Sequence, residues 1–165
     1  YWDPDARGTI IGITQYTTKA HITRAMLEAI CFQTRDVLEA MKADAAHLQL
    51  TALRVDGGAS ANSLLMQIQS DLLGLDVIRP PSVETTSLGA AFAAGLAVGF
   101  FSEYDIFERH PGGDTRFTPA HRGGDAMYAR WKQAVGRSLG WIEGEGEGAA
   151  AASWKDGVSN LMCAG

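Results

Sequence analysis

Residues 54–62 read Arg-Val-Asp-Gly-Gly-Ala-Ser-Ala-Asn, and an apolar pattern of helical period begins directly after them. The residues up to Val55 are typical of the end of a β-strand, and Asp56-Gly57-Gly58 is typical of a tight turn. Ser60 or Asn62 is then expected to cap the next helix. This stretch predicts a strand–turn–helix junction, the unit from which α/β folds are built.

The two glycines of the turn allow two interpretations. Glycine tolerates a positive φ, and its missing Cβ lets another molecule approach the backbone. The N–H groups at the start of the following helix form a donor cluster that suits anionic or polar ligand groups. The junction is therefore either a nucleotide site or a plain left-handed turn, and the Gly-Gly pair alone does not separate the two.

The composition indicates a globular chain. Its 165 residues, 46% hydrophobic and 20% charged, are enough for one domain or a large piece of a bigger one. The net charge of −5 argues against a general nucleic-acid binder. The two cysteines show no metal-ligand spacing, so Cys31 is expected in the core and the protein in a reducing, cytoplasmic setting.

The two ends of the sequence carry separate expectations. The chain starts with Tyr1 rather than Met and shows no signal peptide, so we expect an N-terminal part to be missing. No apolar run approaches the roughly 20 residues that span a bilayer. Residues 143–165 alternate Glu with Gly before an Ala run, which predicts a disordered, dispensable tail behind a domain of residues 1–142.

Strands are predicted to alternate with helices along the chain, which is typical of the α/β class. The expected strands are 8–14, 50–55, 76–79 and a short edge strand at 116–118, and the expected helices are 20–42, 62–73, 84–98 and 125–141. This small number of strands fits a partial domain.

The periodic residues of the helices predict which faces are buried. For the helix 20–42, with Thr17 or Thr18 as its cap, the expected inward residues are Ile22, Met26, Ala29, Ile30, Gln33, Val37 and Met41. For the helix 62–73 they are Leu64, Leu65, Ile68 and Leu72, with Gly74 as the terminating residue. The alanines and glycines of 84–98 predict a close approach of that helix to the sheet. Asp125 is expected to cap the last helix, whose shared face carries Tyr128, Trp131, Val135 and Leu139.

Several separated motifs resemble one family, the FGGY carbohydrate kinases. Residues 8–13, His21-Ile22 and 25–28 look like the second signature of that family. Residues 55–62 resemble its adenosine motif, which actin and the heat-shock chaperones share in outline. Within the family the likeness is to the C-terminal domain of the glycerol kinase branch, through the segments 1–8, 31–38, 66–73 and 84–91. The resemblance covers roughly residues 1–141.

The resemblance implies a ribonuclease-H-like, actin-type ATPase architecture of two lobes around a cleft, with this chain as the last part of the second lobe. It also implies transfer of a phosphoryl group from ATP to glycerol, with Mg²⁺, in a complete enzyme that forms a homo-oligomer. Carried over by position, Gly57, Gly58 and Asn62 are the implied nucleotide-binding residues. A side chain at 58 would collide with the nucleotide, while Asn62 offers a donor and an acceptor to the adenine or ribose edge.

The catalytic aspartate and the glycerol-binding residues of this family lie in the N-terminal lobe or at its junction. None of the aspartates here matches that base, so no catalytic residue and no metal ligand is assigned. Asp56 stays open between a carboxylate that serves phosphoryl transfer and a turn-forming residue beside the glycines. Residues 119–125 do not resemble the acidic loop of bacterial members, which puts partners that use this loop in doubt.

Other candidates carry less information. His21 matches the family signature but stands where helix caps are common, and the remaining histidines, His47, His110 and His121, share no metal-site spacing. Two alternative functions also remain. One is another FGGY kinase that acts on a pentose or pentulose, and the other is a non-catalytic nucleotide-binding or interaction module. The upstream reading frame would distinguish them.

Overall fold

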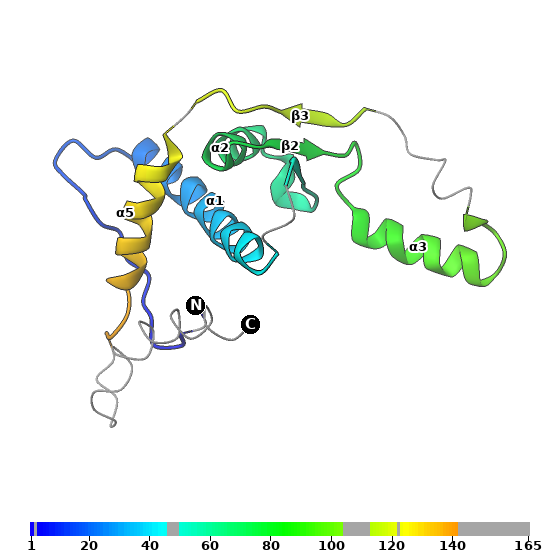
Figure 1. Cartoon of the computed structure of the whole chain (residues 1–165), viewed down its shortest axis with the longest axis horizontal. Helices are drawn as coiled ribbons and strands as arrows, with labels where there is room; N and C mark the ends of the chain where they lie inside the picture. The colour runs from blue at the N-terminus through cyan, green and yellow to red at the C-terminus, as the bar shows by residue number, and fades with distance from the viewer. Residues whose placement is uncertain (2, 46–49, 104–112, 122, 142–165) are drawn as a thin grey trace. The chain divides into compact units, whose positions relative to one another are not determined.

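The computed structural model describes residues 1–141 except 2, 46–49, 104–112 and 122 (Figure 1). The described chain divides into two compact units. One is Thr18–Ala126, which contains the sheet and most helices, and the other joins Tyr1–Thr17 to the residues from Met127 onward. The expected tail at 143–165 lies outside the described residues.

The sheet has three short strands in the order β1-β2-β3. β1 (Ala52–Arg54) runs parallel to β2 (Asp76–Arg79), with Leu53 opposite Val77. β3 (Thr115–Phe117) pairs with β2 in the antiparallel direction. Three of the four expected strands are therefore confirmed, and the parallel pair places the end of β1 beside the end of β2.

The expected strand at 8–14 is wrong. These residues form no strand, and the isoleucines at 10, 11 and 13 are at least half exposed. A strand needs a hydrogen-bonded neighbour, and none of the described strands pairs with this segment. Its β-branched residues have a high strand propensity, but this propensity alone does not form a strand when no neighbouring strand is available.

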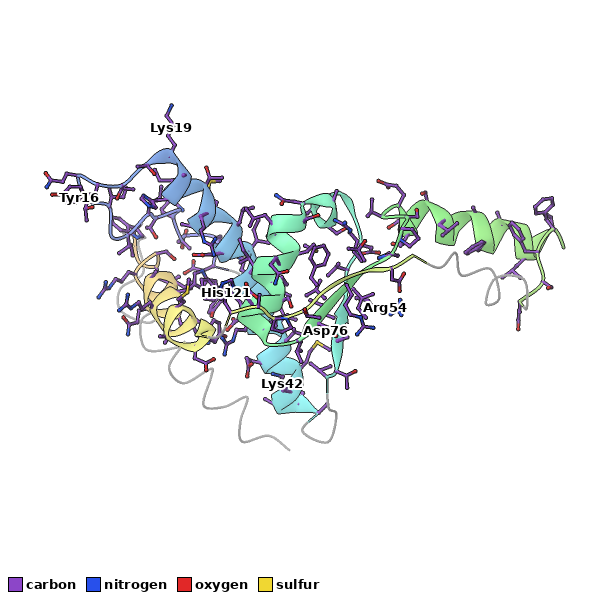
Figure 2. All side chains as sticks on the ribbon, turned by 90° about the horizontal axis from the view of Figure 1, so that it is seen from above. Tyr16, Lys19, Lys42, Arg54, Asp76 and His121 are labelled. Carbon is purple, nitrogen blue, oxygen red and sulfur yellow. The ribbon has the colours of Figure 1, made fainter. Side chains whose placement is uncertain are left out.

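The helices α1 (Lys19–Asp44) and α2 (Ser63–Leu73) pack against each other, and α2 also contacts β2 and β3 (Figure 1). Lys19 and Lys42 mark the two ends of α1 in Figure 2. The core of this unit is formed by Cys31, Phe32, Leu38, Leu65, Met66, Ile68, Leu72, Val77 and Ile78. Burial of these side chains between the two helices and the sheet is what holds the strand–turn–helix junction in place.

The predicted cap of α1 is confirmed. The Thr18 hydroxyl accepts a hydrogen bond from the His21 backbone N–H, and the His21 ring Nδ1 accepts one from the Thr18 N–H at 3.1 Å. This reciprocal capping box satisfies two donors that the helix start would otherwise leave unpaired. His21 is therefore a capping residue in this structure.

The predicted buried face of α1 is wrong for most of its residues, since only Ile22 and Ala29 of that set are half-buried. Four of its residues, Met26, Ile30, Val37 and Met41, are between 49% and 65% exposed. The buried residues of α1 are instead Cys31, Phe32 and Leu38, and the Cys31 thiol contacts α2 at the Leu65 carbonyl oxygen. Periodicity predicts a helix, but it does not say which of two apolar stripes meets a partner, since that depends on the neighbouring element.

The predicted inward face of α2 is confirmed for Leu65, Ile68 and Leu72, all of which are buried. Leu64 is wrong, because its side chain is 53% exposed. Leu64 and Leu65 lie about 100° apart around the helix, so only one can face α1. Gly74 ends the helix with a φ of 66°, as expected for a left-handed residue after a helix end.

Cys31 is a core residue, as predicted. Its side chain is fully buried, and its thiol donates to the Leu65 carbonyl oxygen at 3.7 Å. Burial, with a smaller contribution from the charge of Glu28, raises the pKa of the thiol to about 12. A thiol with so little thiolate at neutral pH is inert, so Cys31 serves the packing of α1 on α2. Cys163 lies outside the described residues.

The helix α3 (Thr85–Ala97) confirms the predicted third helix, but the expected close approach to the sheet is wrong. Most of its residues are exposed, and only Gly95 is buried, under the ring of Phe101. The backbone turns back after Gly99, where the Phe100 N–H donates to the Gly95 carbonyl oxygen at 2.8 Å. The absence of a side chain at Gly95 therefore leaves room for the Phe101 ring, which follows the helix.

The helix α5 (Gly124–Gly136) is shorter than the predicted 125–141. Asp125 lies inside its first turn, and its carboxylate forms an ion pair with Arg35, so the expected cap role is wrong. The Tyr128 and Trp131 rings are stacked with centroids 5.9 Å apart. None of the described helices is both long enough and apolar enough to cross a bilayer.

Candidate functional site

The candidate site lies where β1 ends and α2 begins. Between them stand Asp56, Gly57, the short 3-10 helix η1 (Gly58–Ala61) and Asn62. The N–H of Val55 donates to the Ile78 carbonyl oxygen at 3.0 Å, which ties the end of β1 to β2. Arg54 and Asp76, labelled in Figure 2, come from these neighbouring strands. The junction is thus anchored to the sheet on its strand side.

The two glycines of the junction have different roles. Gly57 has a φ of 79°, a left-handed conformation that favours glycine, and its N–H donates to the Val83 carbonyl oxygen at 2.8 Å. Gly58 has no positive φ and begins η1. A Cβ added at Gly58 would meet no atom within 4 Å, so the space in front of this residue is open. The turn geometry therefore requires Gly57, while Gly58 leaves an accessible stretch of backbone.

Ser60 holds the turn from inside. Its side chain is buried, and its hydroxyl donates to the Gly57 carbonyl oxygen at 2.7 Å. The Ser60 N–H donates to the same oxygen at 3.0 Å. Ser60 is thus an internal brace of η1, and the capping role that the sequence left open between Ser60 and Asn62 belongs to Asn62.

Asn62 caps α2 through its side chain. The Oδ1 atom accepts from the backbone N–H of Leu64 at 3.0 Å and of Leu65 at 3.2 Å. The Oδ1 atom, which was expected to accept a hydrogen bond from the nucleotide, is therefore already occupied by the cap. The Nδ2 amide has no hydrogen-bond partner among the described residues, and Asn62 is exposed. The residue can therefore present a donor, held in a fixed orientation by the cap.

Arg79, the last residue of β2, reaches the far end of η1. Its Nη1 donates to the carbonyl oxygens of Ser60 at 2.9 Å and Ala61 at 3.2 Å, and lies 3.4 Å from the Ser63 hydroxyl. The guanidinium also lies over the Phe117 ring, 5.3 Å from its centroid. Sequence reasoning saw Arg79 only as the end of a strand, because no local pattern links it to a turn some twenty positions earlier.

Asp56 connects the junction to the start of α3. Its carboxylate accepts a hydrogen bond from the hydroxyl of Thr85, the first residue of that helix. The contact adds to the hydrogen bond between the Gly57 N–H and Val83 and joins the Gly-Gly turn to the segment before α3. Asp56 is exposed. Its hydrogen bond to Thr85 connects the turn to α3, a role that no pattern in the sequence indicates.

A second polar cluster surrounds Asp71 on α2. One carboxylate oxygen accepts from the Gln67 amide at 3.0 Å and the Ala120 N–H at 2.7 Å, and the other lies 3.3 Å from the His121 ring. Burial alone would raise the pKa of Asp71, but these hydrogen bonds outweigh it and hold the pKa below its ordinary value. Asp71 thereby fastens the segment after β3 to α2.

Asp71→Asn is expected to destabilise the protein by about 1–2 kcal/mol at pH 7, because it weakens hydrogen bonds to a charged group. A carboxylate with a lowered folded pKa contributes stability above its unfolded pKa, roughly pH 4, and that contribution is lost as the pH falls through the folded pKa. Urea unfolding at pH 7 and pH 3 measures both parts. A difference between the wild type and the variant that stays constant between these pH values would contradict the assignment.

The described residues contain no group of three or more His, Cys, Asp or Glu side chains that could hold a metal ion. His121 pairs with Asp71, and His21 is part of the α1 cap. His47 and His110 lie outside the described residues. The open backbone at Gly58 and the exposed Asn62 amide suit a nucleotide.

Comparison with known proteins shows where the chain belongs. Residues 1–98 match the model of the C-terminal domain of the FGGY family of carbohydrate kinases. Glycerol kinase of Petrotoga mobilis is 54% identical over 145 residues, and that of Mycobacterium tuberculosis is 50% identical over the same length. Each alignment covers 87% of this chain, and the chain spans 29% and 28% of the length of the two relatives.

Solved structures agree on the fold. Plasmodium falciparum glycerol kinase, determined with ADP, superposes with a TM-score of 0.67 at 34% identity, over 86% of this chain and 28% of that one. Gluconate kinase from Lactobacillus acidophilus is similar in fold alone, with a TM-score of 0.57 at 20% identity, over 81% of this chain and 26% of that one. The predicted α/β class, a partial ribonuclease-H-like and actin-type ATPase lobe, is thus confirmed. The chain belongs to the FGGY family of carbohydrate kinases, as a part of its C-terminal domain.

Proposed function

We propose that this chain is the nucleotide-binding part of a glycerol kinase that transfers the γ-phosphoryl group of ATP to glycerol and forms sn-glycerol 3-phosphate. The observation that carries the proposal is the junction at 56–62. There an open backbone at Gly58 stands beside the oriented amide of Asn62. The identity of 50–54% to glycerol kinases supports glycerol as the acceptor.

Within this proposal, Gly57, Gly58 and Asn62 form the nucleotide-binding site. Gly57 shapes the turn, Gly58 lets the nucleotide lie against the backbone, and the Asn62 Nδ2 donates to the adenine or ribose edge. ATP with Mg²⁺ supplies the phosphoryl group in such kinases. The catalytic base and the glycerol site are assigned to the part of the enzyme outside this chain. We also propose that the complete enzyme is a homo-oligomer and that it acts in the cytoplasm.

A substrate panel on the complete enzyme that contains this chain tests the proposed acceptor. With ATP and Mg²⁺ present, glycerol is expected to give a far higher kcat/KM than xylulose or gluconate. A preference for one of those sugars would replace glycerol kinase by another kinase of the family. Failure to phosphorylate any of the three, in a folded protein that still binds ATP, would favour a non-catalytic nucleotide-binding module.

Variants of Asn62 separate its two roles. Asn62→Ala removes the cap and the amide, so we expect a loss of about 0.5–2 kcal/mol in stability as well as a higher KM for ATP. Asn62→Ser keeps a capping oxygen but removes the amide donor, so stability is expected to stay close to wild type. The KM for ATP is still expected to rise several-fold, because one neutral hydrogen bond contributes about 0.5–1.5 kcal/mol.

Thermal unfolding and steady-state kinetics on both variants provide these values. If Asn62→Ser were to match the wild type in stability and in KM for ATP, the amide would have no role in binding, and Asn62 would be a helix cap only.

A further inference from the structure

We propose that Arg79 is a positioning residue for nucleotide binding, which acts by holding the turn that presents Asn62. The inference rests on the proposed nucleotide site and adds a residue to it. Arg79 lies outside the adenosine motif, on the neighbouring strand, and reaches that motif only through space. It is half-buried, so its charge is partly removed from water.

The contacts of Arg79 meet a need of the turn. The carbonyl groups at the end of a short helix lack intrahelical partners, and in η1 these include those of Ser60 and Ala61. The Arg79 Nη1 donates to both, at 2.9 Å and 3.2 Å. An arginine is suited to this place because its guanidinium stays charged, is planar and can lie on an aromatic ring, here that of Phe117.

The Ala61 contact reaches Asn62 through the covalent backbone. The Ala61 carbonyl and the Asn62 N–H belong to one planar peptide unit, so fixing the oxygen fixes the plane. The Asn62 N–H donates from the other side of that plane to the Ala59 carbonyl oxygen at 3.2 Å. Arg79 and η1 thus hold the same peptide from its two edges. The side chain of Asn62 begins at the next atom, with its Oδ1 bound to the start of α2.

Loss of this hold is expected to act on nucleotide binding more than on the fold. The junction stays tied to the sheet by Val55 and to the segment before α3 by Gly57. Without Arg79, the peptide planes at 60–62 gain freedom, and binding must then order them. A site whose supporting contacts are removed loses affinity although its own residues are intact.

The test compares Arg79→Met, Arg79→Lys and the control Arg116→Met in the complete enzyme. Arg116 lies on β3, and its ion pair is with Asp76, so the control removes an arginine from the same sheet at a different contact. Arg79→Met is expected to raise the KM for ATP about tenfold, with the KM for glycerol within about twofold of wild type. Arg79→Lys is expected to recover part of this loss, because an ammonium can reach a carbonyl oxygen but cannot reproduce the flat contact with Phe117.

Amide hydrogen exchange at 58–62 without nucleotide provides a readout besides activity. Exchange is expected to be several-fold faster in Arg79→Met and unchanged in Arg116→Met. A higher KM for ATP with unchanged exchange would mean that Arg79 acts on the nucleotide directly and would overturn the proposal. Equal losses for ATP and glycerol, or no loss at all, would also overturn it. If Arg79→Met does not fold, the same two readouts on Arg79→Lys decide.

Gly58→Val distinguishes this inference from the proposed function. If Gly58→Val impairs ATP use and the Arg79 variants do not, the nucleotide site stands and the positioning role is wrong. If Gly58→Val leaves ATP use intact, the junction is not the nucleotide site, and the role of Arg79 there fails with it.

Discussion

Gly58→Val in the complete enzyme is expected to raise the KM for ATP at least about tenfold, a loss of roughly 1.4 kcal/mol or more. The reason is steric. A side chain at 58 would enter the open space where a nucleotide can lie against the backbone. Glycerol binding without nucleotide is expected to stay nearly unchanged, because the glycerol site is assigned to the other lobe. Steady-state kinetics and glycerol titrations measure the two effects separately.

The backbone conformation sharpens this expectation. Gly58 has no positive φ, and an added Cβ meets nothing within 4 Å. The free energy of unfolding of Gly58→Val is therefore expected to lie within about 0.5 kcal/mol of the wild-type value. Gly57→Val is the contrasting variant, because a β-branched residue at a φ of 79° is strained by about 1–3 kcal/mol and lowers stability. The two neighbouring glycines therefore separate a binding defect from a folding defect.

Gly136→Val is a matched control for Gly58→Val. This glycine at the end of α5 also has no positive φ and no atom within 4 Å of an added Cβ. It is expected to leave the KM for ATP unchanged. If Gly58→Val were to weaken ATP and glycerol binding equally in a folded protein, the Gly-Gly pair would be a structural turn and the nucleotide assignment would be wrong.

The chain by itself is expected to have no glycerol kinase activity. Phosphoryl transfer needs a group that accepts the proton of the substrate hydroxyl and an oriented acceptor site. In the proposed function the catalytic base lies outside this chain, and the chain spans only 29% of the length of a relative such as that of Petrotoga mobilis. The effect is the largest expected here, since removal of the catalytic groups of an enzyme costs many orders of magnitude in rate.

Incubation of the chain with ATP, Mg²⁺ and glycerol, followed by an assay for sn-glycerol 3-phosphate, measures this. The complete enzyme is the positive control and a mixture without protein is the blank. Turnover that rises in proportion to the amount of added chain would contradict the proposal that the catalytic groups lie outside this chain.

Much of the local structure of this protein can be predicted from its sequence. The cap at Thr18, the helix end at Gly74 and the strand at 76–79 can be predicted because each depends on residues close together in the sequence. The junction at 56–62 is of the same kind, since its glycines and its capping Asn62 lie within seven positions. For such features, a short sequence motif is enough to predict the local structure on physical grounds.

The remaining errors concern contacts over long sequence distances. The apolar stripe of α1 is real, but the identity of its buried face depends on α2. The β-branched segment 8–14 has strand propensity without a strand beside it. Within the site, the contact of Arg79 with the carbonyl groups of η1 follows from the pairing of β1 with β2, which brings the ends of both strands together.

A crystal structure of the complete enzyme with bound ADP tests the central claim most directly. The nucleotide is expected to lie against the backbone of Gly58, with the Asn62 Nδ2 within hydrogen-bond distance, about 2.7–3.2 Å, of its adenine or ribose edge. Asn62 is expected to keep its Oδ1 on the start of α2. ADP bound elsewhere, with residues 56–62 making no contact to it, would contradict the assignment of this junction as the nucleotide site.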